Sequence, residues 1–330
     1  MSISTPNFAD VEAAAARIAP WAVRTPLLES PELNDRLGAR IFLKPETLQR
    51  TGSFKFRGAL NTVLQTQAER RSNGVVAFSS GNHAQGVAAA AALFSIPATI
   101  VMPKDAPAPK IAGTRRLGAD IVFYDRYKDD REAIAREIVE RTGATLIEPF
   151  DNAMVVAGQG TVGLELASDA KMRGVTLDAI LAPCGGGGLV TGIALAVSEA
   201  SPGTKVIAVE PERFDGMRLS LAAGVRTTAL GGVASLADAL MAPMPGRIPF
   251  ALAKTLLVNA ISVSDTDLQS AVSYAFQRLK LIVEPGGSAA LAAILSKKYD
   301  VKNKSVAIVL TGANCEIATI SDCCDRVVNP

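Results

Sequence analysis

Short runs of β-branched and apolar residues alternate with longer Ala-rich or amphipathic stretches along most of the 330-residue chain. This alternation is typical of βαβ units, in which helices connect parallel strands. Several of the runs end directly in Gly, Ser or Asn before the next helical stretch. Because ligands of open α/β sheets bind beyond the carboxyl ends of the strands, these junctions are the first candidates for a functional site.

The same pattern predicts the positions of the main elements. Strands are expected at Ile41–Leu43, Val75–Ser79, Ala98–Met102, Ile121–Tyr124, Leu146–Glu148, Ala179–Pro183, Val206–Glu210 and Ser305–Leu310. The expected helices include Ser53–Gln65, Asn82–Phe94, Ile111–Leu117, Asp130–Arg141, Val155–Ala167, Leu189–Ala200, Asp265–Leu279 and Ser288–Ser296. We expect residues 73–148 to form a smaller α/β domain inserted into a larger one made of residues 1–65 and 153–330. A cleft between the two would be the default binding site.

Composition excludes several classes of protein. The chain carries 34 basic and 32 acidic residues, a net charge of +2, whereas a surface that binds nucleic acid would carry a large basic excess. No apolar run approaches the ~18 residues of a membrane-spanning helix, and the first residues lack the blocks of a signal peptide. We therefore expect a cytoplasmic protein that binds neither nucleic acid nor membrane. The four cysteines form no CxxC pair, which suits a reducing compartment.

His83 is the single histidine of the chain. One imidazole cannot build a site that needs two or more, such as an HExxH zinc site, and any Ser-His-Asp triad would have to use this ring. Difficult chemistry must therefore come from lysine, hydroxyls, carboxylates or a cofactor.

Four consecutive glycines, Gly185 to Gly188, follow the apolar run AILAP and precede the helical stretch that begins at Leu189. Without Cβ atoms, successive backbone N–H groups can converge on a phosphate at the helix N-terminus. The alternative is a flexible turn without a ligand. The spacing is neither GxGxxG nor a Walker GK[ST], which argues against dinucleotides and nucleoside triphosphates.

Lys55 stands near the start of a predicted helix between two phenylalanines, in the segment TGSFKFRGA. Desolvation beside Arg57 would lower the pKa of its ammonium group, as an imine-forming lysine requires. A surface lysine with a solvated head is the alternative.

Two further strand-to-helix junctions carry polar groups. In SSGNHAQG, which starts at Ser79, hydroxyls, an amide and free N–H groups could bind a carboxylate; alternatively, Ser80 or Asn82 is only a helix cap and His83 a buried, hydrogen-bonded ring. Thr311 ends another apolar strand, where its hydroxyl could meet a heteroaromatic nitrogen. EPGGS, which starts at Glu284, opens a further helix with ordinary turn chemistry.

Taken together, SFKFRGALN, SSGNHAQG, AGQGT and the glycine loop resemble the signatures of the fold type II pyridoxal-phosphate enzymes, in the threonine/serine dehydratase and serine racemase branch. The resemblance runs from about Thr25 to Asn314. It implies a two-domain α/β fold similar to the β subunit of tryptophan synthase, with mostly parallel sheets and helices on both faces. It also implies pyridoxal 5′-phosphate as the cofactor, a small amino acid as the substrate and a homodimer.

The resemblance also implies roles for individual residues. Lys55 matches the lysine that holds the cofactor covalently and acts as base on Cα, and Ser80 matches the second acid/base position of the racemase. The residues that match the cofactor-binding positions are Lys55, Phe54, Asn82, Gly185, Gly186, Gly187, Gly188, Leu189 and Thr311. The loop that receives the substrate carboxylate is matched by Ser79, Ser80, Gly81, Asn82 and His83.

Two departures from the family pattern stand out. Where relatives commonly have Asp-Gly-Val near the ring, this chain has Asp238-Ala239-Leu240, and the added methyl group of Ala239 narrows the space or moves the loop. The racemase branch binds a divalent cation through a Glu and an Asp six residues later. Glu210 matches the first, but Gly216 replaces the second, and Asp215 could substitute. We predict no metal site.

These residues predict an ammonia-lyase of the EC 4.3.1 type that dehydrates a β-hydroxy amino acid of the serine or threonine type to a 2-oxo acid and ammonia. A racemase that uses Lys55 and Ser80 on opposite faces is the closest alternative. A β-replacement synthase, a nucleotide-binding oxidoreductase and a non-catalytic amino-acid sensor also remain open. No residue is evident as a partner for the substrate's side chain, although Arg126, Arg213 and Arg218 are candidates for a distal anion.

Overall fold

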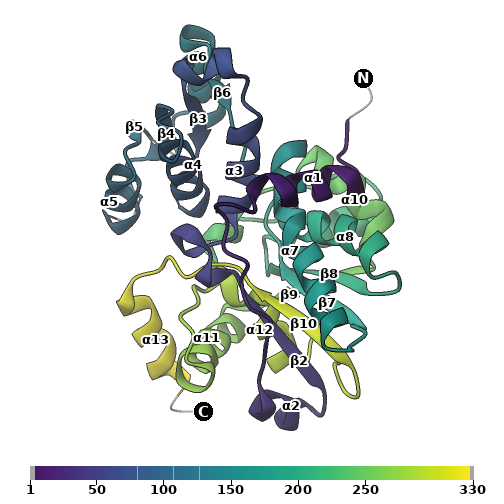
Figure 1. Ribbon diagram of the computed structural model, residues 1–330. Helices are drawn as coiled ribbons and strands as arrows, with labels where there is room; N and C mark the ends of the chain where they lie inside the picture. The colour runs from purple at the N-terminus through teal and green to yellow at the C-terminus, as the bar shows by residue number, and fades with distance from the viewer. Residues whose placement is uncertain (1–3, 80, 107, 126, 328–330) are drawn as a thin grey trace.

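The computed structural model describes residues 4–327 except 80, 107 and 126, so Ser80 and Arg126 lie outside the described residues. The strands form two separate sheets, and Figure 1 shows the smaller one with its helices above the larger one. The strands are β1 (Leu28–Glu29), β2 (Arg40–Pro45), β3 (Val75–Phe78), β4 (Ala98–Pro103), β5 (Asp120–Tyr124), β6 (Thr145–Leu146), β7 (Ala179–Pro183), β8 (Lys205–Pro211), β9 (Asn259–Val263) and β10 (Ser305–Leu310).

Helices pack on both sheets. They are α1 (Phe8–Ile18), α2 (Pro31–Leu37), α3 (Lys55–Gln65), α4 (Asn82–Ala92), α5 (Ala108–Arg116), α6 (Arg131–Thr142), α7 (Ala153–Met172), α8 (Gly188–Ala200), α9 (Gly216–Ala223), α10 (Arg247–Leu256), α11 (Asp265–Tyr274), α12 (Ala289–Leu295) and α13 (Ile317–Val327). No helix among the described residues combines the length and the apolar character that crossing a membrane requires.

The predicted elements are all present, with ends shifted by a few residues. Strands β1 and β9 were not predicted, since the first has two residues and the second carries only one long apolar side chain. Helices α1, α2, α9, α10 and α13 were not predicted either, and α11 was expected to run through Leu279, whereas residues 275–279 form a π-helical turn. The predicted α/β class with mostly parallel sheets and helices on both faces is confirmed.

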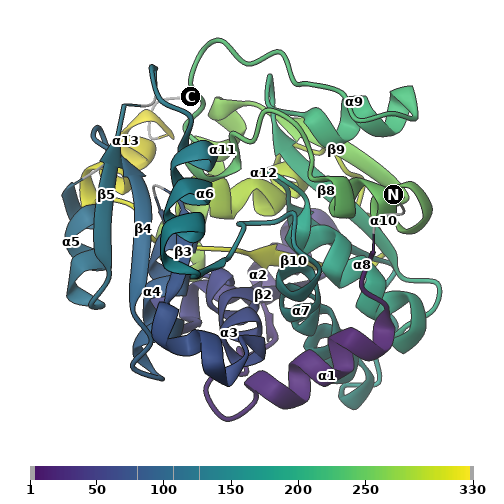
Figure 2. The ribbon, with the colours of Figure 1, turned by 90° about the horizontal axis from the view of Figure 1, so that it is seen from above.

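The larger sheet has the strand order β1-β2-β10-β7-β8-β9, in which only the β1–β2 pair is antiparallel. Alternate residues of its strands enter two different cores. Leu43, Leu181 and Ile308 pack toward α11 and α12, whereas Phe42 and Ile180 pack toward α7 and α8. Figure 2 shows these helix pairs on opposite sides of β10. Burial on both faces explains why these strands are continuous apolar runs in the sequence.

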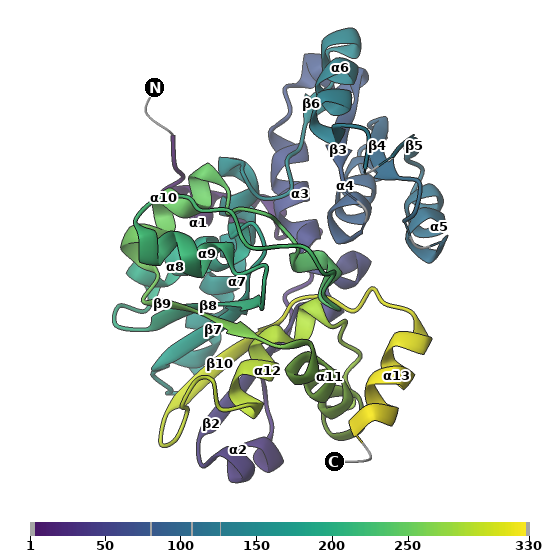
Figure 3. The same cartoon turned by 180° about the vertical axis from the view of Figure 1, so that it is seen from behind.

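The smaller sheet has the order β5-β4-β3-β6 and is parallel throughout. Val75 and Ile100 face a core that includes α4, while Val76 and Val101 face α6. Phe56, Leu60 and other residues of α3 join the first of these cores. Seen from behind in Figure 3, α3 runs between the larger part of the molecule and the smaller sheet.

Glycines let α3 lie close against α7. A Cβ at Gly158 of α7 would lie 2.7 Å from Cα of Gly58, and one at Gly58 would lie 2.7 Å from the carbonyl oxygen of Val155. Any side chain at either position would push the two helices apart. The AGQGT motif of the sequence, which contains Gly158, is therefore part of a helix crossing that fixes α3.

Candidate active site

The carboxyl ends of β3, β7 and β10 open on one pocket between the two sheets. Its lining brings together Phe54, Lys55, Ser79, Gly81, Asn82, His83, Gly185, Gly186, Gly187, Gly188, Leu189 and Thr311. These residues come from distant segments of the chain, and all were singled out from the sequence. Ser80, between Ser79 and Gly81, lies outside the described residues, so the structure gives no account of it.

Lys55 is the first residue of α3, and its side chain lines the pocket. Its Nζ atom donates to the carbonyl oxygen of Pro149 at 2.7 Å and lies 5.2 Å from the centre of the Phe54 ring. Burial disfavours the charged form and lowers the pKa of Lys55 to about 8. About a tenth of this amine is therefore uncharged at pH 7, far more than for an ordinary lysine, and the uncharged form is the one that acts as a nucleophile or base.

The glycine loop connects β7 to α8 and leaves no room for side chains. A Cβ at Gly186 would lie 2.2 Å from the Phe150 ring, and one at Gly187 would lie 2.7 Å from the Met217 side chain. Gly187 also has a φ of +97°, which favours glycine. The loop thus brings bare backbone and the N-terminus of a 13-residue helix to the pocket, which suits an anion such as phosphate.

The loop after β3 is held by its own side chains and by α4. Ser79 Oγ accepts a hydrogen bond from the backbone N–H of Gly81. His83 Nε2 pairs with the carbonyl oxygen of Ile147 at 2.8 Å, and it must donate because a carbonyl only accepts. Burial and the charge of Lys55 lower the pKa of His83 to about 3. Its imidazole is therefore neutral, with the proton on Nε2, while Nδ1 has no hydrogen-bond partner among the described residues.

Thr311 lies directly beside Phe54. Its carbonyl oxygen accepts from the backbone N–H of Phe54 at 3.2 Å, and Ser53 pairs with Gly312 as an antiparallel bridge. Thr311 is 4% exposed and follows directly on β10. These backbone contacts bring the end of a central strand against the start of α3, next to Lys55.

Glu284 is a pocket residue whose role the sequence did not indicate. Asn82 Nδ2 donates to Glu284 Oε1 at 2.5 Å, and Asn82 Oδ1 accepts from Asn314 Nδ2 at 2.7 Å. Burial raises the pKa of Glu284 to about 7, and Asp238 adds to the effect. Since an amide nitrogen carries two hydrogens, Asn82 retains one donor for a ligand.

Two cations of the pocket were also missed, because neither follows a strand end. Lys110 of α5 forms an ion pair with Asp238, with Nζ and Oδ2 2.5 Å apart. Arg131, the first residue of α6, lies over the Phe78 ring at 5.3 Å and lines the pocket. It forms no ion pair with any described carboxylate. Of the arginines proposed from the sequence for a distal anion, Arg213 and Arg218 do not line the pocket, and Arg126 is outside the described residues.

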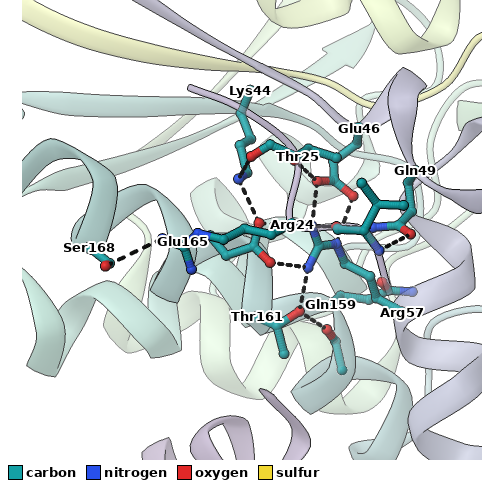
Figure 4. Close-up of polar contacts among 12 residues, drawn as sticks. Arg24, Thr25, Lys44, Glu46, Gln49, Arg57, Gln159, Thr161, Glu165 and Ser168 are labelled. Atoms are coloured by element: carbon teal, nitrogen blue, oxygen red, sulfur yellow. Dashed lines mark hydrogen bonds and ion pairs between the residues drawn. The ribbon is translucent and has the colours of Figure 1, made fainter. Parts of the chain in front are cut away.

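A cluster of charges, buried except for Arg24, lies outside the pocket lining and fixes α3 (Figure 4). Arg57 Nε and Nη2 donate to the two oxygens of Glu46 at 2.7 and 2.8 Å. Arg57 Nη1 and Nη2 donate to the two oxygens of Glu165 at 2.7 and 3.0 Å. Lys44 Nζ donates to Glu165 at 2.6 Å, and Arg24 pairs with Asp169. Arg57 therefore joins α3 to α7 and to the segment that follows β2.

The cation site of the racemase branch does not fit this chain. Both oxygens of Glu210 accept backbone N–H groups, from Met217 at 2.8 Å and from Arg218 at 2.9 Å. Gly216 offers no side chain, and Asp215 pairs with the Arg218 guanidinium. Among the described residues, no three His, Cys, Asp or Glu side chains gather as a metal site would require.

Comparisons with known proteins give the same picture over nearly the whole chain. Residues 18–312 match the model of the family described as "Pyridoxal-phosphate dependent enzyme". The chain is 43% identical to L-threo-3-hydroxyaspartate ammonia-lyase of Saccharomyces cerevisiae, covering 94% of each chain. It is 40% identical to serine racemase of Schizosaccharomyces pombe, covering 94% of this chain and 95% of the relative. A crystal structure of threonine deaminase from T.th. superposes with a TM-score of 0.89 at 43% identity, covering 94% of this chain and 99% of that one.

The pocket fits pyridoxal 5′-phosphate on its own geometry. The glycine loop at the start of α8 offers backbone N–H groups and a helix N-terminus for the phosphate, and it keeps this form only without side chains, since a Cβ at Gly186 would collide with the Phe150 ring. Lys55 reaches the same pocket with an amine of lowered pKa. The predicted cofactor and the predicted fold type are confirmed: this chain belongs to the pyridoxal-phosphate dependent enzyme family, in the branch of the threonine and hydroxyaspartate ammonia-lyases and the serine racemases.

Proposed function

We propose that this protein is a pyridoxal-phosphate dependent ammonia-lyase whose preferred substrate is a β-hydroxy amino acid with a second carboxylate, such as L-threo-3-hydroxyaspartate. The overall reaction removes ammonia and leaves a 2-oxo acid. The lyase class is supported by the ammonia-lyases among the relatives. The choice of a dicarboxylic substrate is carried by Arg131, a cation of the pocket without an ion-pair partner among the described residues.

The roles of the residues follow from their positions. When bound, the cofactor supplies the electron sink that stabilises negative charge at the substrate's Cα. Lys55 would hold the cofactor, and its amine, with a lowered pKa, would serve as the base that takes the proton from Cα. Pro149 orients that amine through its carbonyl oxygen. Gly185 to Gly188 and Leu189 would hold the phosphate, and Phe54 and Thr311 would hold the ring.

The loop of Ser79, Gly81 and Asn82 binds the carboxylate that every amino acid has. Lys110 lies beside this loop, since its Nζ is 3.5 Å from the position that a Cβ would take on Gly81. A second carboxylate needs a separate cation, and Arg131 on α6 supplies one from another side of the pocket. Its planar guanidinium can bind a carboxylate through two hydrogen bonds.

A racemase is the second candidate, favoured by the similarity to serine racemases. It would need Ser80 as the acid on the face opposite Lys55. The homodimer, the cytoplasmic location and the closure of residues 73–148 over the pocket remain predictions. The lining of the pocket supports the last of these, since it takes residues both from 73–148 and from the rest of the chain.

The test is a substrate comparison on the cofactor-loaded protein. L-threo-3-hydroxyaspartate, L-threonine and L-serine are incubated separately, and the 2-oxo acid and the D-isomer are measured. We expect oxo acid in excess of the D-isomer, with the highest kcat/KM for hydroxyaspartate. A D-isomer that accumulates almost without oxo acid would establish the racemase instead.

Arg131→Met tests the side-chain partner. A lost hydrogen bond to a charged group is worth about 1.5–3 kcal/mol, so kcat/KM for hydroxyaspartate should fall about 10- to 100-fold while that for L-serine changes little. Arg141→Met, at the end of the same helix and away from the pocket, is the matched control. An equal loss for both substrates would refute the role of Arg131 in selecting the side chain.

A further inference from the structure

Lys110 and Asp238 form an ion pair across the mouth of the pocket. Lys110 belongs to α5, beside the smaller sheet, and Asp238 belongs to a short 3-10 turn at residues 238–240, beside the larger one. Of the ion pairs among the described residues, it is the one that joins residues 73–148 to the rest of the chain. Both side chains line the pocket itself.

Each partner is attached to one of the loops that receive the ligand. On one side, Lys110 Nζ lies against Gly81, in the loop proposed to bind the substrate carboxylate. On the other side, the turn that carries Asp238 continues into Leu240, whose Cα is 3.2 Å from the position that a Cβ would take on Gly185. The ion pair therefore connects the carboxylate loop to the phosphate loop.

The surroundings of the pair favour a contact that can open. The Lys110 side chain is 12% exposed, but that of Asp238 is 45% exposed, so solvent can replace the ammonium group at the carboxylate. A half-exposed pair is a weak interaction, so it can bias a position without locking it. The cluster around Arg57 differs, because Arg57 and Glu46 are almost completely buried.

We propose that Lys110 and Asp238 are positioning residues that form a latch, which holds residues 73–148 closed over the pocket and thereby retains the substrate. The inference rests on the proposed substrate site, since the latch acts on the loop assigned to the carboxylate. It goes further in naming the contact that controls access to this site. Neither side chain is required for the chemistry at Cα.

The experiment compares Lys110→Met, Asp238→Asn and their combination in the cofactor-loaded protein. We expect each single change to raise KM about five- to tenfold while kcat stays within about twofold, because an open pocket loses uniform binding of the substrate. The double variant should be no worse than either single one, since both changes remove the same contact. Lys298→Met, which breaks an ion pair remote from the pocket, is the matched control.

Amide hydrogen exchange gives a second readout that needs no turnover. We expect faster exchange in α5 and in residues 236–242 of both single variants, since local opening becomes easier. Exchanging the two charges, with Lys110→Glu and Asp238→Lys together, should restore slow exchange and most of the lost KM. If the proposed substrate is wrong, exchange still reports on the latch.

The remaining outcomes would overturn the proposal. Unchanged amide hydrogen exchange and an unchanged KM in the single variants would mean that the ion pair does not hold residues 73–148 in the closed position. A lower melting temperature with an unchanged KM would assign the pair to stability alone. A third outcome is a KM that rises in the single variants and stays high when the two charges are swapped, while amide hydrogen exchange remains slow. This outcome would mean that Lys110 binds the substrate directly.

Discussion

Lys55 and Arg57 stand two residues apart on α3 and lie in opposite surroundings. Arg57 faces away from the pocket and donates to two carboxylates, to the Thr161 hydroxyl and to the Val23 carbonyl oxygen. Lys55 faces the pocket and donates to one neutral carbonyl oxygen. The pKa of Arg57 is raised by Glu46 and Glu165, whereas burial without a countercharge lowers that of Lys55. A buried cation is thus structural or reactive according to the anions around it.

The cluster around Arg57 is close to electrically balanced. Three cations, Arg24, Lys44 and Arg57, face the carboxylates of Glu46, Glu165 and Asp169. In the pocket, by contrast, Lys55 and Arg131 have no described carboxylate as an ion-pair partner. The pocket lining holds three cations, Lys55, Lys110 and Arg131, against Asp238 and Glu284, and the pKa of Glu284 is raised to about 7. This excess of cations suits an anionic ligand, whereas the balanced cluster has no vacant charge to offer.

Replacing Lys55, the reactive cation of the two, should have the largest effect on activity. Lys55→Ala takes away both the covalent attachment and the base, so oxo-acid formation should fall by at least about 10³-fold. The visible absorption of bound cofactor should also disappear on dialysis. A variant that kept covalent cofactor and activity would show that another amine holds the cofactor, and the proposed site would be wrong.

Replacing Arg57, the structural cation, should lower the stability of the fold more than it affects the reaction. Arg57→Met leaves the buried Glu46 and the mostly buried Glu165 without their main countercharge, so the free energy of unfolding should fall by about 3–5 kcal/mol in a denaturant titration. Combining it with Glu46→Gln should recover part of this loss, because the buried Glu46 carboxylate is then removed while Glu165 keeps Lys44 as its countercharge.

Arg278→Met is the control for that experiment. Arg278 pairs with Glu32 on the surface, where both side chains are about half exposed. Exposed pairs contribute only about 0–1 kcal/mol, so a small loss is expected. If Arg57→Met cost no more than this control, the contrast between the two regions would not hold.

The lowered pKa of Lys55 predicts a smaller effect of pH. From pH 7 to pH 8 the uncharged fraction of an amine with a pKa of about 8 rises about fivefold, so covalent capture of added cofactor should accelerate by this factor and level off above about pH 9. A rate that continued to rise tenfold per unit to pH 10 would indicate an ordinary lysine. Stopped-flow absorbance measures the rate.

The same pKa has a consequence for stability. Folding lowers the pKa of Lys55 from 10.5 to about 8, so the unfolded chain binds more protons between these values. The contribution of Lys55 to the stability of the cofactor-free protein should therefore rise as the pH increases from about 8 to 10.5, and it should be constant below about pH 8. Lys55→Met should remove this dependence.

The sequence predicted those parts of the molecule that depend on local pattern. Buried parallel strands are apolar runs, and the glycine loop and Lys55 stand at junctions that can be recognised in the chain, so both were found. The edge strand β9 was missed because its sequence, NAISV, is half polar. Helix α10 begins with Arg247 and has proline at its third position, which hides its apolar side.

The site residues that the sequence did not predict were missed for a different reason. Lys110, Arg131 and Glu284 reach the pocket from helix starts and a turn, and only the packing of the two sheets brings them there. Arg57 was predicted to assist Lys55 by desolvation beside it, but its guanidinium turns to Glu46 and Glu165 on the other side of α3. The direction of a side chain on a helix depends on what the helix packs against, which a single sequence does not show.

Helix α3 contributes to the core of the smaller sheet and also crosses α7 at paired glycines. Lys55 therefore lies on the helix that connects residues 73–148 to the larger part of the molecule. In the proposed closure, residues 73–148 would rotate about α3, the helix that carries the Lys55 amine. We therefore expect substitutions at Gly58 or Gly158, which would loosen this helix crossing, to impair the proposed closure although neither residue lines the pocket.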